Sequence, residues 1–283
     1  MPGAPPPAVP EPDEAVAAAL LRHRRERQTI GSTEQIADIP PDRAYAIQAL
    51  VVADRLARGE RRAGWKLGYT SAAMRAQMGI DTPNTGPLTD AMLLADGAML
   101  PDTMIHPRVE PEVALVMAVD VRAPVPADGI VECVADVRAS LEVVDSVWED
   151  YRFTWAMNTA DGSSAAYAVI GPTLDATELP AMGVTLTRNG IDAGGGSPAD
   201  AMGGPFMALA WLAEELIGRG EFLSAGDVVL TGGLTRAVEI APGDVVTGAF
   251  GALGRAVVDR FTNAGARHFV LLARRSPDDD AMA

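Results

Sequence analysis

The chain has 283 residues, of which 48% are hydrophobic and 22% are charged, and its formal net charge is -15. This composition predicts a globular protein large enough for a full core, and so acidic a surface argues against nucleic acid and anionic membranes as partners. The one cysteine excludes an internal disulfide framework. The sequence has no signal-peptide pattern and no apolar run of the ~18 residues that a membrane helix needs, which predicts a cytoplasmic protein.

The N-terminal part of the chain predicts a small helical lobe over residues 12–90. Residues 1–11 are rich in proline and are expected to be disordered. A helix is expected from about Asp13, and residues 44–58 show apolar side chains at helical spacing and end at Gly59.

Lys66 is the only lysine in the chain, within a short alternating segment that predicts a strand. Almost every other basic residue is Arg, so a bias toward Arg could have replaced every lysine for which Arg can substitute. A lysine that remains then marks a position where Arg cannot serve. Lys can act as an acid or a base where Arg cannot, because its pKa moves on burial. Lys66 is therefore a candidate catalytic residue, the alternative being the chance survival of one surface lysine.

Glu110 and Glu112 stand two residues apart at the start of a valine-rich run that predicts a strand over residues 108–117. Strand side chains alternate between faces, so both carboxylates are expected to point the same way. Two like charges beside a core need a cation, and hard divalent metals bind carboxylate oxygens. A solvated strand end with two surface glutamates explains the spacing equally well. Glu142, between Leu141 and Val143, is a third acidic candidate, because an unpaired buried charge is costly.

The rest of the chain predicts short strands separated by turns, hence an α+β protein with a curled, mixed β-sheet roll over residues 91–270 and a tail over residues 271–283. Apolar residues over 131–137 predict a helix. Asn189-Gly190 predicts a hairpin turn. Asp161 lies in a turn, and the glycine turn at residues 231–233 has the exposed backbone N–H groups that suit a carboxylate.

These motifs, in this order, resemble the 2-keto-4-pentenoate hydratase and 4-oxalocrotonate decarboxylase group of the fumarylacetoacetate hydrolase superfamily over residues 42–261. The segments that carry the resemblance are Gly64-Trp65-Lys66-Leu67-Gly68, Pro107-Arg108-Val109-Glu110-Pro111-Glu112-Val113-Ala114, Leu141-Glu142-Val143-Val144-Asp145-Ser146, Ala160-Asp161 and Leu230-Thr231-Gly232-Gly233.

The resemblance implies a fumarylacetoacetate hydrolase-like β-roll, usually oligomeric, that binds Mg²⁺ or Mn²⁺ through Glu110, Glu112 and Glu142. It places the family's lysine at Lys66 and its acidic acid–base residue at Asp161. Substrate contacts are expected from the Thr231-Gly232-Gly233 turn, from Arg236 and from Ser71.

The same resemblance implies a metal-dependent lyase of aromatic catabolism acting on a small 2-oxo or 2-hydroxydienoic acid. We expect decarboxylation of a 4-oxalocrotonate-like diacid through an enolate that the metal stabilises. The alternative is a hydratase of a 2-hydroxypenta-2,4-dienoate-like or 2-oxohept-4-enedioate-like substrate. A C–C bond hydrolase, for which only His106 is available as a base, and a catalytically silent binding protein stay open. Gly162, Val147 and Gly204 depart from the family pattern, which allows a relative recruited to another pathway.

Overall fold

The computed structural model describes residues 13–31, 39–72, 75–76 and 79–251, and the backbone of residues 268–274. The predicted disordered segment 1–11 and residues 275–283 of the predicted tail lie outside the described residues, as do residues 73–74 and 77–78. No helix among the described residues is both long enough and apolar enough to traverse a bilayer.

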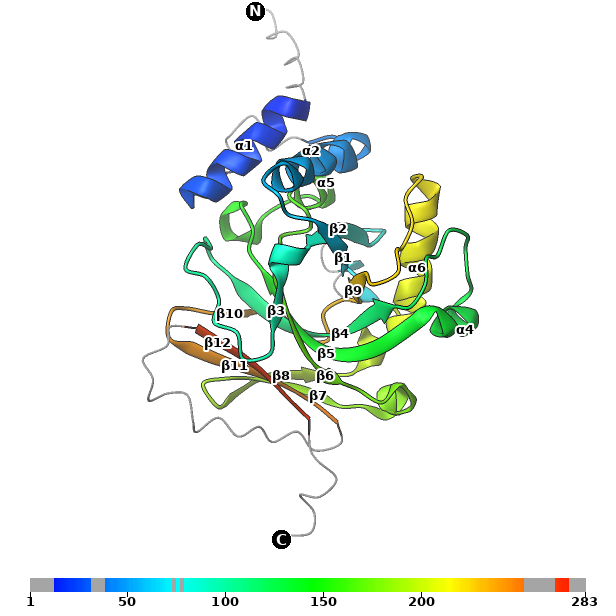
Figure 1. Ribbon diagram of the computed structural model, residues 1–283. Coiled ribbons are helices and arrows are strands. Elements are labelled where there is room, and N and C mark those ends of the chain that lie inside the picture. The colour runs from blue at the N-terminus through cyan, green and yellow to red at the C-terminus, as the bar shows by residue number, and fades with distance from the viewer. Residues whose placement is uncertain (1–12, 32–38, 73–74, 77–78, 252–267, 275–283) are drawn as a thin grey trace, which may run out of the picture.

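An eight-stranded mixed sheet forms the centre of the molecule, in the order β2-β1-β9-β4-β5-β6-β3, with β10 paired to β4 (Figure 1). Most neighbours are antiparallel, but β1 runs parallel to β9 and β3 runs parallel to β6. The strands are β1 (Arg62–Gly68), β2 (Asn84–Thr89), β3 (Leu93–Ala95), β4 (Arg108–Met117), β5 (Val134–Val144), β6 (Ala165–Thr173), β9 (Val228–Leu230) and β10 (Val238–Glu239).

A second sheet of four strands lies below the first in Figure 1, in the order β12-β11-β7-β8. Its strands are β7 (Val184–Arg188), β8 (Ile191–Gly196), β11 (Asp244–Phe250) and β12 (His268–Arg274). The predicted hairpin is confirmed, because β7 and β8 pair antiparallel around Asn189 and Gly190, with φ of 55° and 74°. Positive φ at both central residues matches the twist of the flanking strands.

The helical lobe consists of α1 (Asp13–Glu26), α2 (Ala44–Ala57) and α5 (Trp155–Ala160), grouped above the sheet in Figure 1. Their apolar faces share a buried cluster with Val147 and Trp148. The lobe therefore includes a helix from the middle of the chain, which closes it against the sheet. The strands β1 and β2 fall within the predicted lobe range of residues 12–90. They nevertheless belong to the large sheet, in which β1 pairs in parallel with β9.

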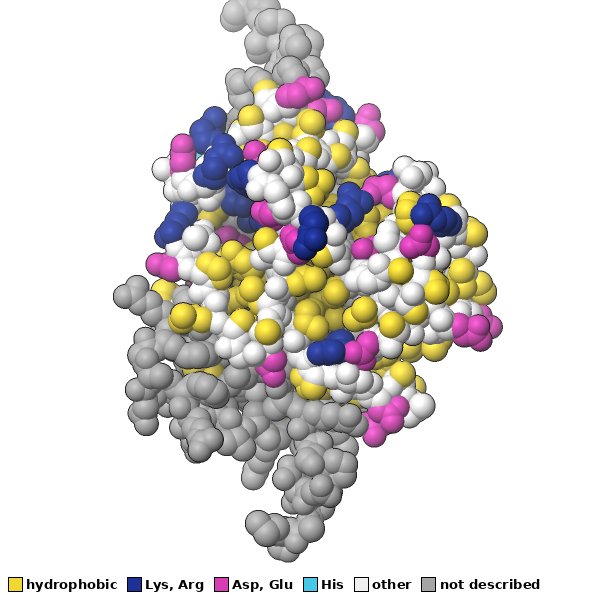
Figure 2. Space-filling model, viewed as in Figure 1, with side chains coloured by type: hydrophobic (Ala, Val, Ile, Leu, Met, Phe, Trp, Pro, Cys, Tyr) yellow, Lys and Arg dark blue, Asp and Glu magenta, His cyan; other side chains and the backbone are white. Residues whose placement is uncertain are grey.

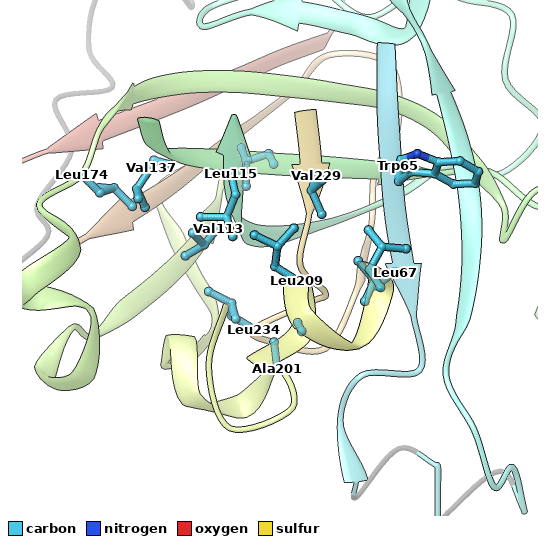
Figure 3. Packing of buried hydrophobic residues seen from close by; sticks show 14 of the residues in the cluster. Trp65, Leu67, Val113, Leu115, Val137, Leu174, Ala201, Leu209, Val229 and Leu234 are labelled. Atoms are coloured by element: carbon cyan, nitrogen blue, oxygen red, sulfur yellow. The ribbon is translucent and has the colours of Figure 1, made fainter. Parts of the chain in front are cut away.

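The main core lies between the large sheet and α6 (Pro205–Gly218). Figure 3 shows Leu209 of α6 pointing at Val229, with Leu67 and Val113 on either side. This packing fixes strands β1, β4 and β9 relative to one another. The remaining helices are short: α4 (Ala127–Ile130) and 3-10 turns at Pro41–Arg43, Asp90–Met92, Val131–Cys133, Glu149–Tyr151, Ala176–Ala181 and Pro198–Asp200.

The predicted helix over residues 131–137 is wrong. Residues 131–133 form a 3-10 turn, and β5 begins at Val134 and pairs with β4 along its length. Valines three residues apart fit a helix face, but β-branched side chains favour a strand when a partner strand is available.

Candidate active site

Three glutamates converge on one face of the central sheet. Glu110 and Glu112 share a face of β4, and the antiparallel register sets Glu142 of β5 directly opposite Glu110. One carboxylate oxygen from each residue lies within 4.8 Å of the others. Glu112 and Glu142 are buried and Glu110 is half-buried. The alternative interpretation, a solvated strand end with two surface glutamates, is therefore wrong. Like charges directly opposite one another destabilise a sheet unless a cation compensates them.

Pro111 lies inside β4, in a regular stretch of the β4–β5 ladder. Its carbonyl accepts the N–H of Leu234 at 2.9 Å. The nitrogen and oxygen of a strand residue point to the same side. The missing N–H of Pro111 therefore faces the turn at residues 231–234, and β5 loses no hydrogen bond.

The glycine turn after β9 touches two of the three carboxylates. The N–H of Gly232 donates to Glu112 Oε2 at 2.8 Å. A Cβ at Gly233 would overlap the carboxylate of Glu110, and a Cβ at Gly232 would overlap Thr70. The predicted anion-binding backbone thus holds a carboxylate of the protein itself, and it orients Glu112.

The charge of the cluster is reflected in the pKa of each member. Burial raises the pKa of Glu110 to about 7, helped by the charge of Glu142 and opposed by Lys66. Burial, with the charges of Glu142 and Glu110, raises the pKa of Glu112 well above its ordinary value. Burial also raises the pKa of Glu142, although Lys66 lowers it.

Lys66 of β1 is buried beside the cluster, and its Nζ lies 3.1 Å from Glu142 Oε2. The same Nζ donates to the carbonyl oxygen of Ser163 at 3.1 Å and to its Oγ at 3.2 Å. Burial lowers the pKa of Lys66, but the three glutamates more than offset this effect and its pKa is raised. Lys66 is therefore held as an ammonium group.

The residues present fit a divalent metal. Glu112 Oε1 and Glu142 Oε1 are buried without a hydrogen-bond partner, and one ammonium group faces three carboxylates. A set made only of carboxylate oxygens suits a hard cation such as Mg²⁺ or Mn²⁺. Glu110, Glu112 and Glu142 would hold it, with further positions left to water or substrate.

The raised pKa values predict how metal binding depends on pH. Without metal, the folded protein binds more protons at these carboxylates than the unfolded chain does, so their contribution to stability is present at low pH and is lost as the pH rises through about 7. The same carboxylates would have to lose those protons in order to bind Mg²⁺. We expect the increase in melting temperature on adding Mg²⁺ to be larger at about pH 8 than at about pH 6, measured by calorimetry against EDTA. An equal increase at both values would contradict the assignment.

A cleft of about 450 Å³ adjoins the glycine turn at Thr70 and contains one predicted substrate residue, Ser71. The other predicted substrate residues are not among those that line this cleft. The Thr231 hydroxyl donates to the carbonyl of Val113, and Arg236 is exposed. The cleft is lined by Thr70, Ser71, Ala72, Arg75, Ala199, Asp200, Met202 and Gly203.

Asp161 lies on the lobe side of the site. Its Oδ1 accepts from Arg24 Nη2 at 2.6 Å and its Oδ2 accepts from the N–H of Val147 at 3.3 Å. It borders a second cleft, of about 360 Å³, beneath α1 and α2, where basic side chains gather on the surface shown in Figure 2. Among the described contacts, Asp161 is not joined to the three glutamates; it ties α1 to the turn that follows α5.

The three departures from the family pattern fall in different surroundings. Val147 is buried in the core of the lobe. Gly162 has a φ of 73° and precedes Ser163. Gly204 has a φ of 147°, stands at the start of α6, and has no atom within 4 Å of the position of a Cβ. Its neighbour Gly203 lines the 450 Å³ cleft.

Sequence reasoning missed Ser163, Asn84 and Arg24. Ser163 contacts Lys66, Asn84 contacts Ser163, and Arg24 pairs with Asp161. A serine in a turn or an asparagine in a loop has no distinctive pattern. The one available signal for Ser163 was its place directly after Asp161-Gly162.

The family model described as Fumarylacetoacetate (FAA) hydrolase C-terminal matches residues 73–259. A 4-oxalocrotonate decarboxylase of Pseudomonas putida is 35% identical over 220 residues, which are 75% of this chain and 82% of that protein. A 2-keto-4-pentenoate hydratase of Burkholderia vietnamiensis is 37% identical over 233 residues, covering 78% of this chain and 88% of the relative. A second model, described as KR domain, matches only residues 244–283, most of which lie outside the described part.

Among solved structures, the 4-oxalocrotonate decarboxylase from Pseudomonas putida G7, complexed with magnesium and adipate, has a TM-score of 0.80 and 28% sequence identity. The match covers 92% of this chain and 97% of that one. Fumarylpyruvate hydrolase from Pseudomonas aeruginosa, with a TM-score of 0.52 and 18% identity, shares the fold alone. The predicted mixed β-roll with helices is confirmed.

Proposed function

The chain belongs to the fumarylacetoacetate hydrolase family, and on that premise we propose that it is a divalent-metal-dependent lyase that decarboxylates a 4-oxalocrotonate-like 2-oxo diacid. The observation that carries the proposal is the buried set of Glu110, Glu112 and Glu142 beside Lys66. It stands in a fold that matches a magnesium-bound decarboxylase over nearly its whole length.

A divalent cation held by the three carboxylates would supply a Lewis acid for the 2-oxo acid end of the substrate. When the bond to the distal carboxylate breaks, its electron pair moves into the conjugated system and CO₂ leaves. Negative charge then develops on the oxygen of the former ketone. Lys66, an ammonium group fixed 3.1 Å from Glu142, is placed to stabilise that charge. A proton delivered to the resulting enolate completes the reaction.

A hydratase of a 2-keto-4-pentenoate-like acid is the second candidate, because relatives with that name match at 31% to 37% identity. It would use the same cluster and differ in adding water to the double bond. The decarboxylase is preferred because of the structural match and its near-complete coverage.

The hydrolase alternative has little support. Hydrolysis of a C–C bond in this superfamily requires a base to activate water, and His106 was the available candidate. His106 Nε2 lies 2.8 Å from the carbonyl oxygen of Ser146, and its ring packs on Tyr151. These contacts give the His106 ring a structural role.

The acid–base role of Asp161 and the substrate contacts from Ser71, Arg236 and the Thr231-Gly232-Gly233 turn stay proposals. The Arg24 ion pair favours a supporting role for Asp161, and the position of Ser71 in the cleft favours a substrate contact. We also propose a homo-oligomer, on the family resemblance, and a cytoplasmic location, on the single cysteine.

The proposal is tested by incubating the protein with 4-oxalocrotonate and, separately, with 2-hydroxypenta-2,4-dienoate, each with Mg²⁺ and with EDTA. Trapped CO₂ and ultraviolet absorbance are measured together. We expect Mg²⁺-dependent CO₂ release from 4-oxalocrotonate that EDTA abolishes. Loss of dienoate absorbance without CO₂ from either compound would instead assign the hydratase. Turnover of neither compound while Mg²⁺ still binds would overturn both assignments.

A further inference from the structure

A strained turn leads from α5 into β6. Three successive residues have positive φ: Gly162 at 73°, Ser163 at 57° and Ser164 at 56°. Only glycine adopts this region readily, so two consecutive serines there store conformational strain. The turn is held in place because the N–H of Ser163 donates to the carbonyl of Asn158 at 2.8 Å.

The effect of this turn is to bring two oxygens of one residue to Lys66. Ser163 is buried, and both its carbonyl oxygen and its Oγ accept from Lys66 Nζ, at 3.1 and 3.2 Å. With Glu142 Oε2 at 3.1 Å, the ammonium group has three acceptors for its three N–H bonds. Its direction is therefore fully determined.

The direction of the Ser163 hydroxyl is determined as well. Thr159 donates its own proton to the carbonyl of Trp155, so it accepts from Asn84 Nδ2 at 2.9 Å. This fixes the orientation of the Asn84 amide and leaves Asn84 Oδ1 to accept the Ser163 proton at 2.9 Å. A lone pair of Ser163 Oγ is thus always available to Lys66.

Two glycines make room for this network. A Cβ at Gly68 would overlap both Asn84 Oδ1 and Ser163 Oγ. A Cβ at Gly86 would overlap the carbonyl oxygen of Gly162. The strands β1 and β2 therefore carry no side chain where the turn approaches them most closely.

We infer that Ser163 is a positioning residue for Lys66, with Asn84 holding its hydroxyl in the accepting orientation. The inference rests on the proposed function only in taking Lys66 to be the catalytic cation. Ser163 acts through Lys66 and fixes the distance between the ammonium group and the three carboxylates. The positive φ of Ser163, a conformation that glycine can also adopt, allows the carbonyl and the hydroxyl of one residue to reach the same nitrogen atom.

The test is Ser163→Gly, which removes the hydroxyl and relieves the strain at a φ of 57° because glycine accepts that conformation. We expect kcat for CO₂ release to fall about 10- to 100-fold, while KM and the Mg²⁺ dissociation constant change by less than about threefold. Ser164→Gly is the matched control: Ser164 has the same backbone conformation, but its hydroxyl accepts from Asn158 and not from Lys66. Its kcat should stay within about twofold of the parent value.

A double-mutant cycle shows whether Ser163 acts through Lys66. In a Lys66→Met background, Ser163→Gly should lower kcat by less than about twofold, because its target is gone. An equal loss in both backgrounds, or an unchanged kcat for Ser163→Gly alone, would overturn the positioning role. If Lys66→Met itself keeps full activity, the proposed function fails at Lys66, which is a result distinguishable from failure at Ser163.

Discussion

Replacing Glu112 with Gln is expected to weaken Mg²⁺ binding by at least about 100-fold and to lower kcat/KM by about 1000-fold or more. Gln keeps the size of the side chain and can still accept the Gly232 N–H. It removes one of the three buried carboxylates that are proposed as ligands, and no other acidic cluster of this kind lies among the described residues. Titration calorimetry with Mg²⁺ and the CO₂ assay measure the two losses on the same preparation.

Glu239→Gln is the matched control for that substitution, because Glu239 is exposed on β10, a strand that pairs with the same β4. It removes the same charge from the chain without touching the cluster. Normal Mg²⁺ affinity in Glu112→Gln, with a melting temperature like that of the parent, would refute the assignment of Glu112 as a ligand.

Replacing Lys66 with Met should lower kcat by about 100- to 10,000-fold, because it removes the cation that faces the developing negative charge. Mg²⁺ affinity should be retained or increased in this variant, because the ammonium group and a metal bound at the proposed site would compete for the same carboxylates. This opposite effect on activity and on metal binding separates a catalytic role from general damage to the site. The measurements are single-turnover CO₂ release and Mg²⁺ titration.

We expect the Lys66→Arg variant to lose activity as Lys66→Met does, although it keeps a positive charge. The guanidinium group is larger and planar, and Lys66 Cδ already lies close to Gly86 where β1 pairs with β2. Full activity in Lys66→Arg would show that any cation suffices there, and an unchanged kcat in Lys66→Met would remove Lys66 from the mechanism.

Parts of the carboxylate cluster could be predicted from local sequence patterns, and the full set of three glutamates followed from the family resemblance. Alternation along a strand placed Glu110 and Glu112 on one face, and the buried surroundings of Glu142 marked it as a charge in need of a partner. The structure brings all three together through the β4–β5 register. The alternation of β4 and the apolar neighbours of Glu142 are local signals, whereas the pairing of β4 with β5 is not, and only the family resemblance predicted that the three residues form one site.

The surroundings of Lys66 could not be predicted, because they depend on chain segments far apart in sequence. Ser163 lies 97 residues beyond Lys66, and Asp161 lies 137 residues beyond its partner Arg24. No pattern within a window encodes such a pairing. The helix expected over residues 131–137 failed for a related reason: pairing with β4 determines the conformation of β5.

The helical lobe is connected to the catalytic strands by the same turn that holds Lys66. Arg24 of α1 donates to Asp161, and the turn at residues 162–164 follows immediately and contacts Lys66 through Ser163. The position of α1 is therefore linked to that of the Lys66 ammonium group through neighbouring residues of one segment.

The most direct test of this account is a crystal structure of the protein grown with Mn²⁺, with anomalous scattering measured to locate the ion. We predict a single strong peak at bonding distance from oxygens of Glu110, Glu112 and Glu142, with Lys66 beside it. A peak bound elsewhere, or none at the cluster when Mn²⁺ is in excess, would contradict the claim that these three carboxylates form the metal centre of a lyase.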